Sequence, residues 1–394
     1  MLAHSPPLPL VIQYTENSSA ITIEDEEGLI SALKQRNRVR RFCLHTSVNT
    51  LKKFIVAIEK EYPILEYLII WCWTEDDSTL LMFPETFHAP NLHHLALFDL
   101  LPIGSLLLTS AARLVTLCLV ISGTSTYFHP NTLLQWLSFM PQLETLNINI
   151  LFSLDSDEER QLTHPPVMTP VTLPNLHSFS FQGYTSMYVD VLVHRITPCP
   201  EKLEIYFPNQ ITLSIPRLVQ FMKTTWNHQF ESVKFKFSRW QVDVVVYPRG
   251  EAEMYSLSVT VESYDFDWLV SYVAQVSDSF GQIFSAVERL TLELISDADN
   301  WISEDPYIEQ NGFSRIEWRQ LLGSFSNVKT LRIENGFVRV VSRCLESDDG
   351  GLPSELLPEL KELTYSPSDQ SGDEFTSFID ARQDAGRPIT LTPY

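Results

Sequence analysis

Residues that could carry out catalytic or metal chemistry are sparse in this 394-residue sequence. It contains no P-loop, no glycine-rich dinucleotide turn after a strand, no Gly-x-Ser-x-Gly nucleophile turn and no zinc-ligand spacing. His93 and His94 are adjacent on a predicted strand, so their side chains point to opposite faces and cannot chelate one metal ion. Residues 297–300 begin like a calcium loop, but Trp301 and Ile302 occupy the positions of a ligand and of the turn glycine. The sequence therefore predicts no enzyme, no cofactor and no metal site.

Binding is the chemistry that remains, and its candidates are aromatic, amide and imidazole side chains at alternate positions of short apolar strands. The residues expected to bind a protein are Tyr67, Ile69, Trp71, Trp73, His94, Phe98, Asn147 and Asn149. Their predicted neighbours on the same face are Arg41, Cys43, His45, Ala96, Thr145, Ser178, Ser180 and Gln182. Trp and Tyr are enriched among residues that dominate interface energies. The alternative is that adjoining loops or the N-terminus cover these rings.

A repeated motif must supply those strands. It consists of Pro, any residue, then an apolar Leu-x-x-Leu-x-Leu core. The copies with Pro begin at Pro63, Pro90, Pro141, Pro174 and Pro358. Weaker copies have their first apolar residue at Val39, Leu114, Leu203, Val233, Val287 and Val328. The spacing between successive copies from Val39 to Val233 is 22 to 33 residues. This motif and spacing resemble those of leucine-rich repeats, with a period of about 20–29 residues.

Helical spacing alternates with the strand motif. Leu51, Phe54, Ile55 and Ile58 fall on one helical face behind a possible cap at Asn49. The same spacing predicts helices that begin near Pro130, contain Trp318 to Phe325, and run over residues 268–284. We expect an α/β fold: an irregular leucine-rich-repeat solenoid, or horseshoe, with a concave parallel sheet and convex helices. The predicted binding residues would then lie on the concave side.

One stretch interrupts the repeat rhythm. Two runs with alternating valines lie on either side of Pro248-Arg-Gly250, which predicts an antiparallel hairpin insertion over residues 240–263. We expect one solenoid domain over residues 1–394, with a truncated N-terminal unit at 1–36 and a C-terminal cap at 374–394. Residues 8–14 are predicted as a strand and 26–34 as a helix.

Composition narrows the possible partners. The formal net charge of −21 disfavours nucleic acid and anionic membranes, because both need clustered Lys and Arg. Residues 100–121 are apolar, but Pro102, Gly104 and Arg113 interrupt them, so we expect a buried helix followed by a strand. Five cysteines without Cys-x-x-Cys pairing fit reduced thiols in the cytoplasm or nucleus.

Several segments resemble a large family of F-box proteins with degenerate leucine-rich repeats that is expanded in mushroom-forming fungi. They are residues 8–14, 24–28, 38–41, 61–68, 139–146, 325–331 and 375–382. The resemblance implies that the repeats select substrates for a ubiquitin ligase, with a Skp-type adaptor and a cullin as partners. In that family, the segment that resembles residues 1–10 follows the F-box. This copy is therefore expected to lack the F-box, as a truncated gene model or a truncated paralogue would. No residue is therefore assigned to adaptor contact.

Two functions stay open on this basis. The first is substrate recognition for an F-box-type ubiquitin ligase. The second is a stand-alone repeat scaffold that binds a protein partner without any ligase. An F-box encoded upstream would favour the first, and a true start at Met1 would favour the second.

Overall fold

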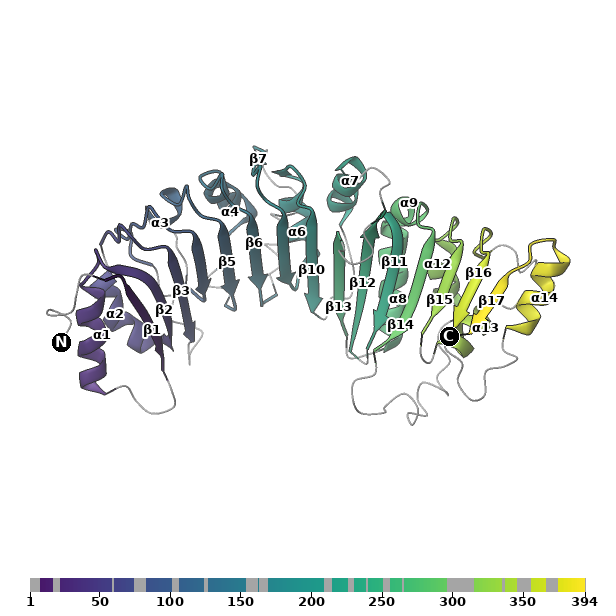
Figure 1. Cartoon of the computed structure of the whole chain (residues 1–394), viewed down its shortest axis with the longest axis horizontal. Coiled ribbons are helices and arrows are strands. Elements are labelled where there is room, and N and C mark those ends of the chain that lie inside the picture. Colours follow the sequence, from purple (N-terminus) through teal and green to yellow (C-terminus); the bar gives the residue numbers. More distant parts are fainter. Residues whose placement is uncertain are drawn as a thin grey trace. The chain divides into compact units, whose positions relative to one another are not determined.

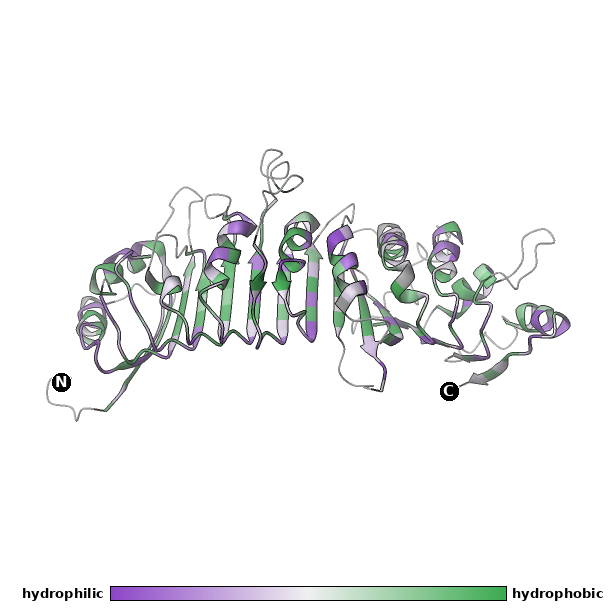
Figure 2. Ribbon diagram, turned by 90° about the horizontal axis from the view of Figure 1, so that it is seen from above, coloured by the Kyte–Doolittle hydropathy of each residue, from purple (hydrophilic) through white to green (hydrophobic). Residues whose placement is uncertain are grey.

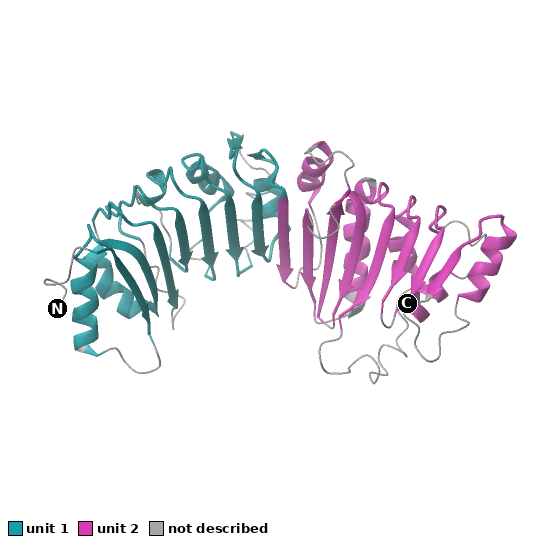
Figure 3. Ribbon diagram, viewed as in Figure 1, with its two compact units in different colours: residues 1–201 teal, residues 202–394 magenta. Residues whose placement is uncertain are grey.

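The computed structural model of the chain is shown in Figure 1. It describes residues 8–16, 22–58, 60–73, 83–100, 106–123, 127–153, 162, 169–208, 215–225, 230–238, 240–250, 256–263, 266–295, 315–334, 337–345, 356–365 and 375–393. The chain divides into two compact units, residues 1–201 and 202–394 (Figure 3), and each is described by itself.

Unit 1 alternates strands with helices. Its strands are β1 (Leu10–Thr15), β2 (Val39–Ser47), β3 (Tyr67–Trp73), β4 (His94–Phe98), β5 (Thr116–Ile121), β6 (Thr145–Ile150), β7 (Val171–Thr172), β8 (Ser178–Gly183) and β9 (Ile196–Thr197). Its helices are α1 (Ile23–Leu33), α2 (Val48–Ile58), α3 (Leu106–Thr109), α4 (Pro130–Leu137) and α6 (Ser186–Val193). Strands β1 to β6 and then β8 pair in chain order, and every pair is parallel. The short β7 and β9 form a separate parallel pair.

Unit 2 has the same alternation with one interruption. Its strands are β10 (Lys202–Pro208), β11 (Phe230–Phe237), β12 (Gln241–Pro248), β13 (Leu257–Glu262), β14 (Arg289–Leu294), β15 (Thr330–Ile333), β16 (Glu362–Tyr365) and β17 (Thr390–Pro393). Its helices are α7 (Pro216–Thr225), α8 (Phe266–Ser279), α9 (Gly281–Phe284), α12 (Arg315–Gly323), α13 (Val338–Leu345) and α14 (Thr376–Asp384). Each of the eleven motif copies has become a strand of one of the two units. The predicted α/β leucine-rich-repeat architecture is therefore confirmed.

The antiparallel hairpin is also confirmed, as strands β12 and β13. It does not stand between β11 and β14, although it separates them in the sequence, because β11 and β14 pair directly and in parallel. Instead β11, β12 and β13 form an antiparallel meander, with β13 parallel to β10. The spatial order is β10-β13-β12-β11-β14. The insertion therefore fills the sheet between β10 and β11.

An asparagine explains part of the motif. In three copies, the residue before the first apolar position is Asn, and its side-chain amide donates a hydrogen bond to a main-chain carbonyl of the preceding copy. The pairs are Asn91 to Pro63 at 2.6 Å, Asn175 to Pro141 at 3.2 Å and Asn327 to Ser285 at 2.5 Å. Each acceptor lies two residues before the first apolar residue of its copy. These bonds link successive copies in the same register in both units.

Most residues of the helical stripes lie in the core, as expected for repeat units that bury their apolar faces on one another, but Ile55 of α2 is only partly buried. Leu51, Phe54, Trp318 and Leu321 are completely buried. The stripe over residues 268–284 is divided between α8 and α9, so it is not one helix. Pro130 occupies the first turn of α4, as predicted.

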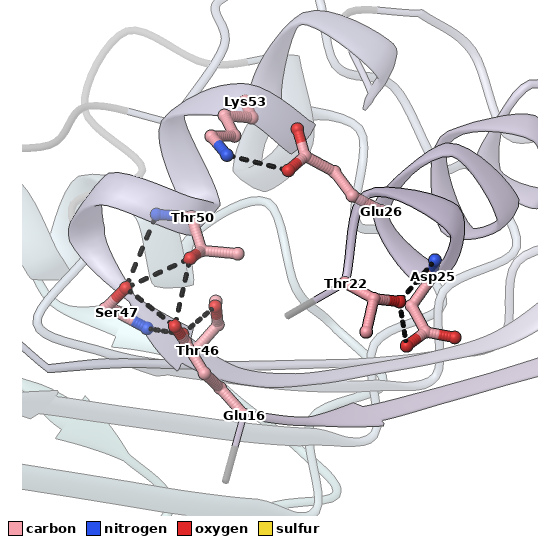
Figure 4. A network of polar contacts seen from close by, with 8 residues as sticks. All are labelled: Glu16, Thr22, Asp25, Glu26, Thr46, Ser47, Thr50 and Lys53. Atoms are coloured by element: carbon pink, nitrogen blue, oxygen red, sulfur yellow. Dashed lines mark hydrogen bonds and ion pairs between the residues drawn. The ribbon is translucent and has the colours of Figure 1, made fainter. Parts of the chain in front are cut away.

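Helix α2 begins one residue before the predicted cap at Asn49. The Oγ of Ser47 accepts a hydrogen bond from the Thr50 N–H at 3.4 Å. The Glu16 carboxylate, which follows β1, accepts from the Ser47 N–H at 2.6 Å and from hydroxyls of Thr46 and Thr50 at 2.7 and 3.1 Å (Figure 4). A carboxylate is stabilised at a helix N-terminus because the free N–H groups and the helix dipole are positive there. This network ties the first strand to the second helix.

Two further expectations concern the apolar segment at residues 100–121 and the C-terminal segment. Residues 100–121 contain the short α3, whose Leu107 and Leu108 are buried, and then β5. None of the helices in the described ranges combines the length and apolar character needed to cross a bilayer. The C-terminal segment supplies α14 and β17, and β17 adds a parallel strand to β16.

Candidate functional site

The helices of unit 1 lie along one side of its strands, and the other side of the sheet is called the open face of unit 1 (Figure 2). Along β3, Leu68, Ile70 and Cys72 point to the helix side and are fully buried. The alternate residues are partly accessible, and Trp71 is 47% exposed. The same alternation follows from the pleat in the neighbouring strands.

Because the strands are parallel and in register, equivalent positions form three rows across the open face. The first row is Val11, Arg41, Tyr67, His94, Thr116, Thr145 and Ser178. The second is Gln13, Cys43, Ile69, Ala96, Cys118, Asn147 and Ser180. The third is Thr15, His45, Trp71, Phe98, Val120, Asn149 and Gln182, and Trp73 lies beyond it opposite Ser47.

Aromatic rings gather on β2, β3 and β4. The Trp71 and Phe98 rings stack with centroids 4.5 Å apart and planes 5° from parallel. The Tyr67 and His94 rings stack in the same way, at 4.3 Å and 7°. The His45 ring meets Trp71 and Trp73 edge-on, with centroids 4.9 and 4.8 Å away. Such geometries stabilise ring pairs by about 0.5–1.5 kcal/mol beyond the area they bury, so the cluster is held in place before any partner arrives.

The face becomes polar and uncharged on β6 and β8. The side chains there include the amides of Asn147, Asn149 and Gln182. Each amide has an NH₂ group that can donate two hydrogen bonds and an oxygen that can accept them. Within the described residues these three side chains make no hydrogen bond. Their hydrogen-bonding groups are therefore available to a ligand in place of water.

Charge is nearly absent from the strand positions of this face. Arg41 is the one side chain with a full charge in the three rows, and its guanidinium lies 5.7 Å from the Tyr67 ring centroid. It makes no ion pair with another described residue. Among the described residues just outside these rows, Glu66 pairs with Arg40 at 2.8 Å, Glu144 lies 3.7 Å from His177, and Asp99 directly follows Phe98. On a chain with a net charge of −21, the three rows of described strand positions on the open face of unit 1 thus contain no Asp or Glu.

The titratable groups of this face are poorly placed for catalysis. Burial lowers the pKa of the His94 imidazole, which favours its neutral form. Burial raises the pKa of the Cys43 and Cys118 thiols, so both stay protonated at neutral pH and are weak nucleophiles. No cluster of His, Cys, Asp or Glu that could hold a metal ion occurs in the described parts of the chain. Residues 297–302, the imperfect calcium loop, lie outside them.

All the predicted binding residues lie on the open face. Tyr67, Ile69, Trp71 and Trp73 come from β3, and His94 and Phe98 from β4, so these six are contiguous. Asn147 and Asn149 lie on β6, and β5 separates them from the rings. The prediction named no residue of β5 and none of β1. The weaker motif copy at Leu114 contained the signal for β5, since its alternate positions are the polar or small Thr116, Cys118 and Val120.

The corresponding open face of unit 2 has a different chemistry. Its charges pair with one another: Lys234 with Glu293, Lys202 with Glu204 at 2.8 Å, and Arg332 with Glu334 at 2.7 Å. The Asp243 carboxylate accepts hydrogen bonds from Thr260 at 2.8 Å and Gln241 at 2.7 Å, and Glu262 accepts one from Tyr206 at 2.5 Å. These polar groups already have partners inside the unit.

Comparison with known proteins gives no family by sequence. No protein-family model matches the chain, and no curated protein matches it.

Three solved structures show weak likenesses to this chain. The leucine-rich-repeat protein LegL7 of Legionella pneumophila is 11% identical, over 94% of this chain and 87% of its own, with a TM-score of 0.29. An internalin, InlF, of Listeria monocytogenes is 10% identical over 94% of both chains, with a TM-score of 0.26. The TLR13–ssRNA13 complex gives 13% identity over 88% of this chain and 44% of the other, with a TM-score of 0.24. At such scores the fold assignment rests on the strand and helix order described above.

Proposed function

We propose that this chain is a non-enzymatic repeat scaffold that binds another protein, with the open face of unit 1 as its recognition surface. The observation that carries the proposal is the combination on that face of accessible stacked rings with amides and an arginine that have no hydrogen-bond or ion-pair partner within the described residues. Trp, Tyr and Arg are the residues most often found to dominate binding energies at interfaces.

The test is whether the capture of partner proteins depends on the open face of unit 1. Tagged wild-type chain and a Trp71→Ala/Phe98→Ala variant are used to capture proteins from the source cells, and the captured proteins are quantified by mass spectrometry. Partners should fall at least tenfold on the double variant, because one hot-spot residue typically contributes about 2 kcal/mol or more. Phe139→Ala is the matched control, since it removes a ring that is 40% exposed outside the open face. Equal capture by all three proteins would refute the proposal.

The finer proposal is that this scaffold is the substrate-recognition part of an F-box-type ubiquitin ligase receptor. It is supported by the sequence segments that resemble fungal F-box repeat proteins, such as residues 61–68 and 139–146. The helices of the described residues belong to strand–helix units, so we assign none of them to a Skp-type adaptor. The partners of this finer role would be the adaptor, a cullin and a client protein.

The ligase link is tested with two tagged forms of the chain. One is the present sequence, and the other is extended through any coding sequence upstream of Met1. Co-purification of the adaptor and cullin with the extended form supports the ligase role. Co-purification with neither form, together with face-dependent capture of a client, supports a stand-alone scaffold instead.

A further inference from the structure

The open face of unit 1 has a local organisation that indicates what kind of partner fits it. Along β3 and β4, Ile69 and the buried Ala96 lie side by side between the Tyr67–His94 ring pair and the Trp71–Phe98 ring pair. A position with an aliphatic floor and rings on two sides is suited to one large apolar side chain of a partner.

The charge of the surroundings indicates the polarity of what accompanies that side chain. Arg41 lies on β2, opposite Tyr67, which is two residues before Ile69 on β3. At ordinary strand dimensions, the Cα atoms of Arg41 and Ile69 are about 8 Å apart. The Arg41 guanidinium contacts the Tyr67 ring and makes no ion pair within the described residues. The three rows of described strand positions contain no carboxylate that could pair with a basic group, whereas Arg41 can pair with an acidic one. An acidic group of the partner, placed beside its apolar side chain, would therefore have Arg41 as its counterpart.

Beyond the rings, the face offers the groups that a peptide main chain requires. The amides of Asn147, Asn149 and Gln182 can donate to carbonyls and accept from N–H groups, and none is used by a described neighbour. An extended segment advances about 3.3 Å per residue. It can therefore reach from Arg41 past the rings toward these amides within about nine residues.

We infer that the open face of unit 1 binds an extended polypeptide segment of a partner protein. The segment places one large apolar side chain between the two ring pairs and carries an Asp or Glu within about three residues of it, facing Arg41. This inference rests on the proposed function and specifies its ligand. Single-stranded RNA would also stack on rings, but one unpaired arginine on an acidic chain offers little to a phosphate backbone.

The experiment is a selection with a library of random nonapeptides displayed on phage, performed on the purified full chain. Trp71→Ala/Phe98→Ala is the counter-target. Arg41→Glu tests the charge, and Lys52→Glu makes the same charge change on an exposed position of α2, on the helix side. Urea unfolding checks that every variant is folded.

The expected result is enrichment of peptides with one large apolar residue and an acidic residue within three positions. Binding of the selected peptides, measured by fluorescence anisotropy, should weaken at least tenfold on the double variant. Arg41→Glu should abolish or invert the acidic preference, and Lys52→Glu should leave it unchanged.

Three results would overturn the inference: basic peptides are enriched, nothing is enriched above the double variant, or a labelled single-stranded poly(U) RNA binds in a Trp71- and Phe98-dependent way. Failure of the inference can be distinguished from failure of the proposed function. If a partner protein is captured in a face-dependent way while no peptide is selected, the extended-segment ligand is wrong and the binding face stands. If neither binding depends on the face, both proposals fail.

Discussion

The open faces of the two units are built from the same alternating strand positions, yet they use them in opposite ways. In unit 2, Asp243 holds hydrogen bonds from Thr260 and Gln241, and Lys234 pairs with Glu293 on the adjacent strand. In unit 1, the equivalent middle positions hold Ile69, Ala96 and Asn147, which have no such partners among the described residues. Under the proposed function, pairing inside the sheet, rather than exposure alone, is what separates the structural face of unit 2 from the recognition face of unit 1.

The register between neighbouring strands makes this difference possible. Equivalent residues of neighbouring strands stand side by side, so opposite charges attract and like charges repel across the sheet. Lys236, for example, stands in register between Asp243 on the antiparallel strand β12 and Glu293 on the parallel strand β14. A face that satisfies its own charges in this way has little left for a partner, whereas rings and amides without partners keep their binding capacity.

The largest expected effect tests which side of the sheet is core. Leu68→Ala should lower the free energy of unfolding by about 2–5 kcal/mol, since it empties a fully buried position. Trp71→Ala, three residues along the same strand, should cost only about 1 kcal/mol, because its ring is half exposed and loses mainly its stacking. Urea unfolding measures both. A loss of several kcal/mol for Trp71→Ala would mark Trp71 as core and end the comparison.

The second effect compares a paired with an unpaired polar residue. Asp243→Ala should destabilise the protein by about 1–3 kcal/mol, because it removes a charged acceptor of two hydrogen bonds and leaves Thr260 and Gln241 without it. Asn147→Ala on unit 1 should stay within about 0.5 kcal/mol of wild type. Chemical denaturation of both variants decides this, and equal losses would mean that Asn147 has a structural role.

A smaller effect is expected for the ion pair between Lys234 and Glu293, which are both a quarter exposed. A double-mutant cycle with Lys234→Met and Glu293→Gln should give a coupling of no more than about 1 kcal/mol, and it should shrink in 1 M salt. A coupling near zero at low salt would show that charge pairing does not organise the open face of unit 2.

The smallest effect is a pH dependence on the open face of unit 1. Burial lowers the pKa of His94 in the folded protein, so the unfolded chain binds the proton more tightly. The contribution of His94 to the free energy of unfolding should therefore be fully present above about pH 6.5 and decline as the pH falls below that value. His94→Gln should reduce this decline, and His129, whose pKa is also lowered by burial, should account for part of the remainder. An unchanged pH profile in His94→Gln would contradict the packing described for this ring.

The sequence was sufficient for the repeat because its motif expresses two periodicities directly. Alternation in residues such as Leu146 and Ile148 predicted strands, and the helical stripe of Leu51 and Phe54 predicted the helix between them. The sequence could not give the order β10-β13-β12-β11, since the pairing of β11 with β14 is made between segments far apart in the chain. It also placed the cap of α2 at Asn49 rather than Ser47, because the Glu16 carboxylate that reinforces this end comes from another strand.

For the candidate site, the direction of each side chain was predictable from the pleat, and the eight residues lie where alternation puts them. The absence of carboxylates from the three described rows could not be recognised in a single motif copy, because it depends on the register between separate strands. Nor could the sequence show that the polar groups of unit 2 satisfy one another, since that depends on the register of β12 against β13.

The measurement that tests the central claim most directly compares one aromatic residue from each open face. Trp71→Ala and Tyr247→Ala remove rings from β3 and β12, and both variants are used to capture partner proteins, which are quantified against wild type. The account predicts that capture falls at least tenfold with Trp71→Ala and stays unchanged with Tyr247→Ala. Loss of capture with Tyr247→Ala and none with Trp71→Ala would contradict it and move recognition to unit 2.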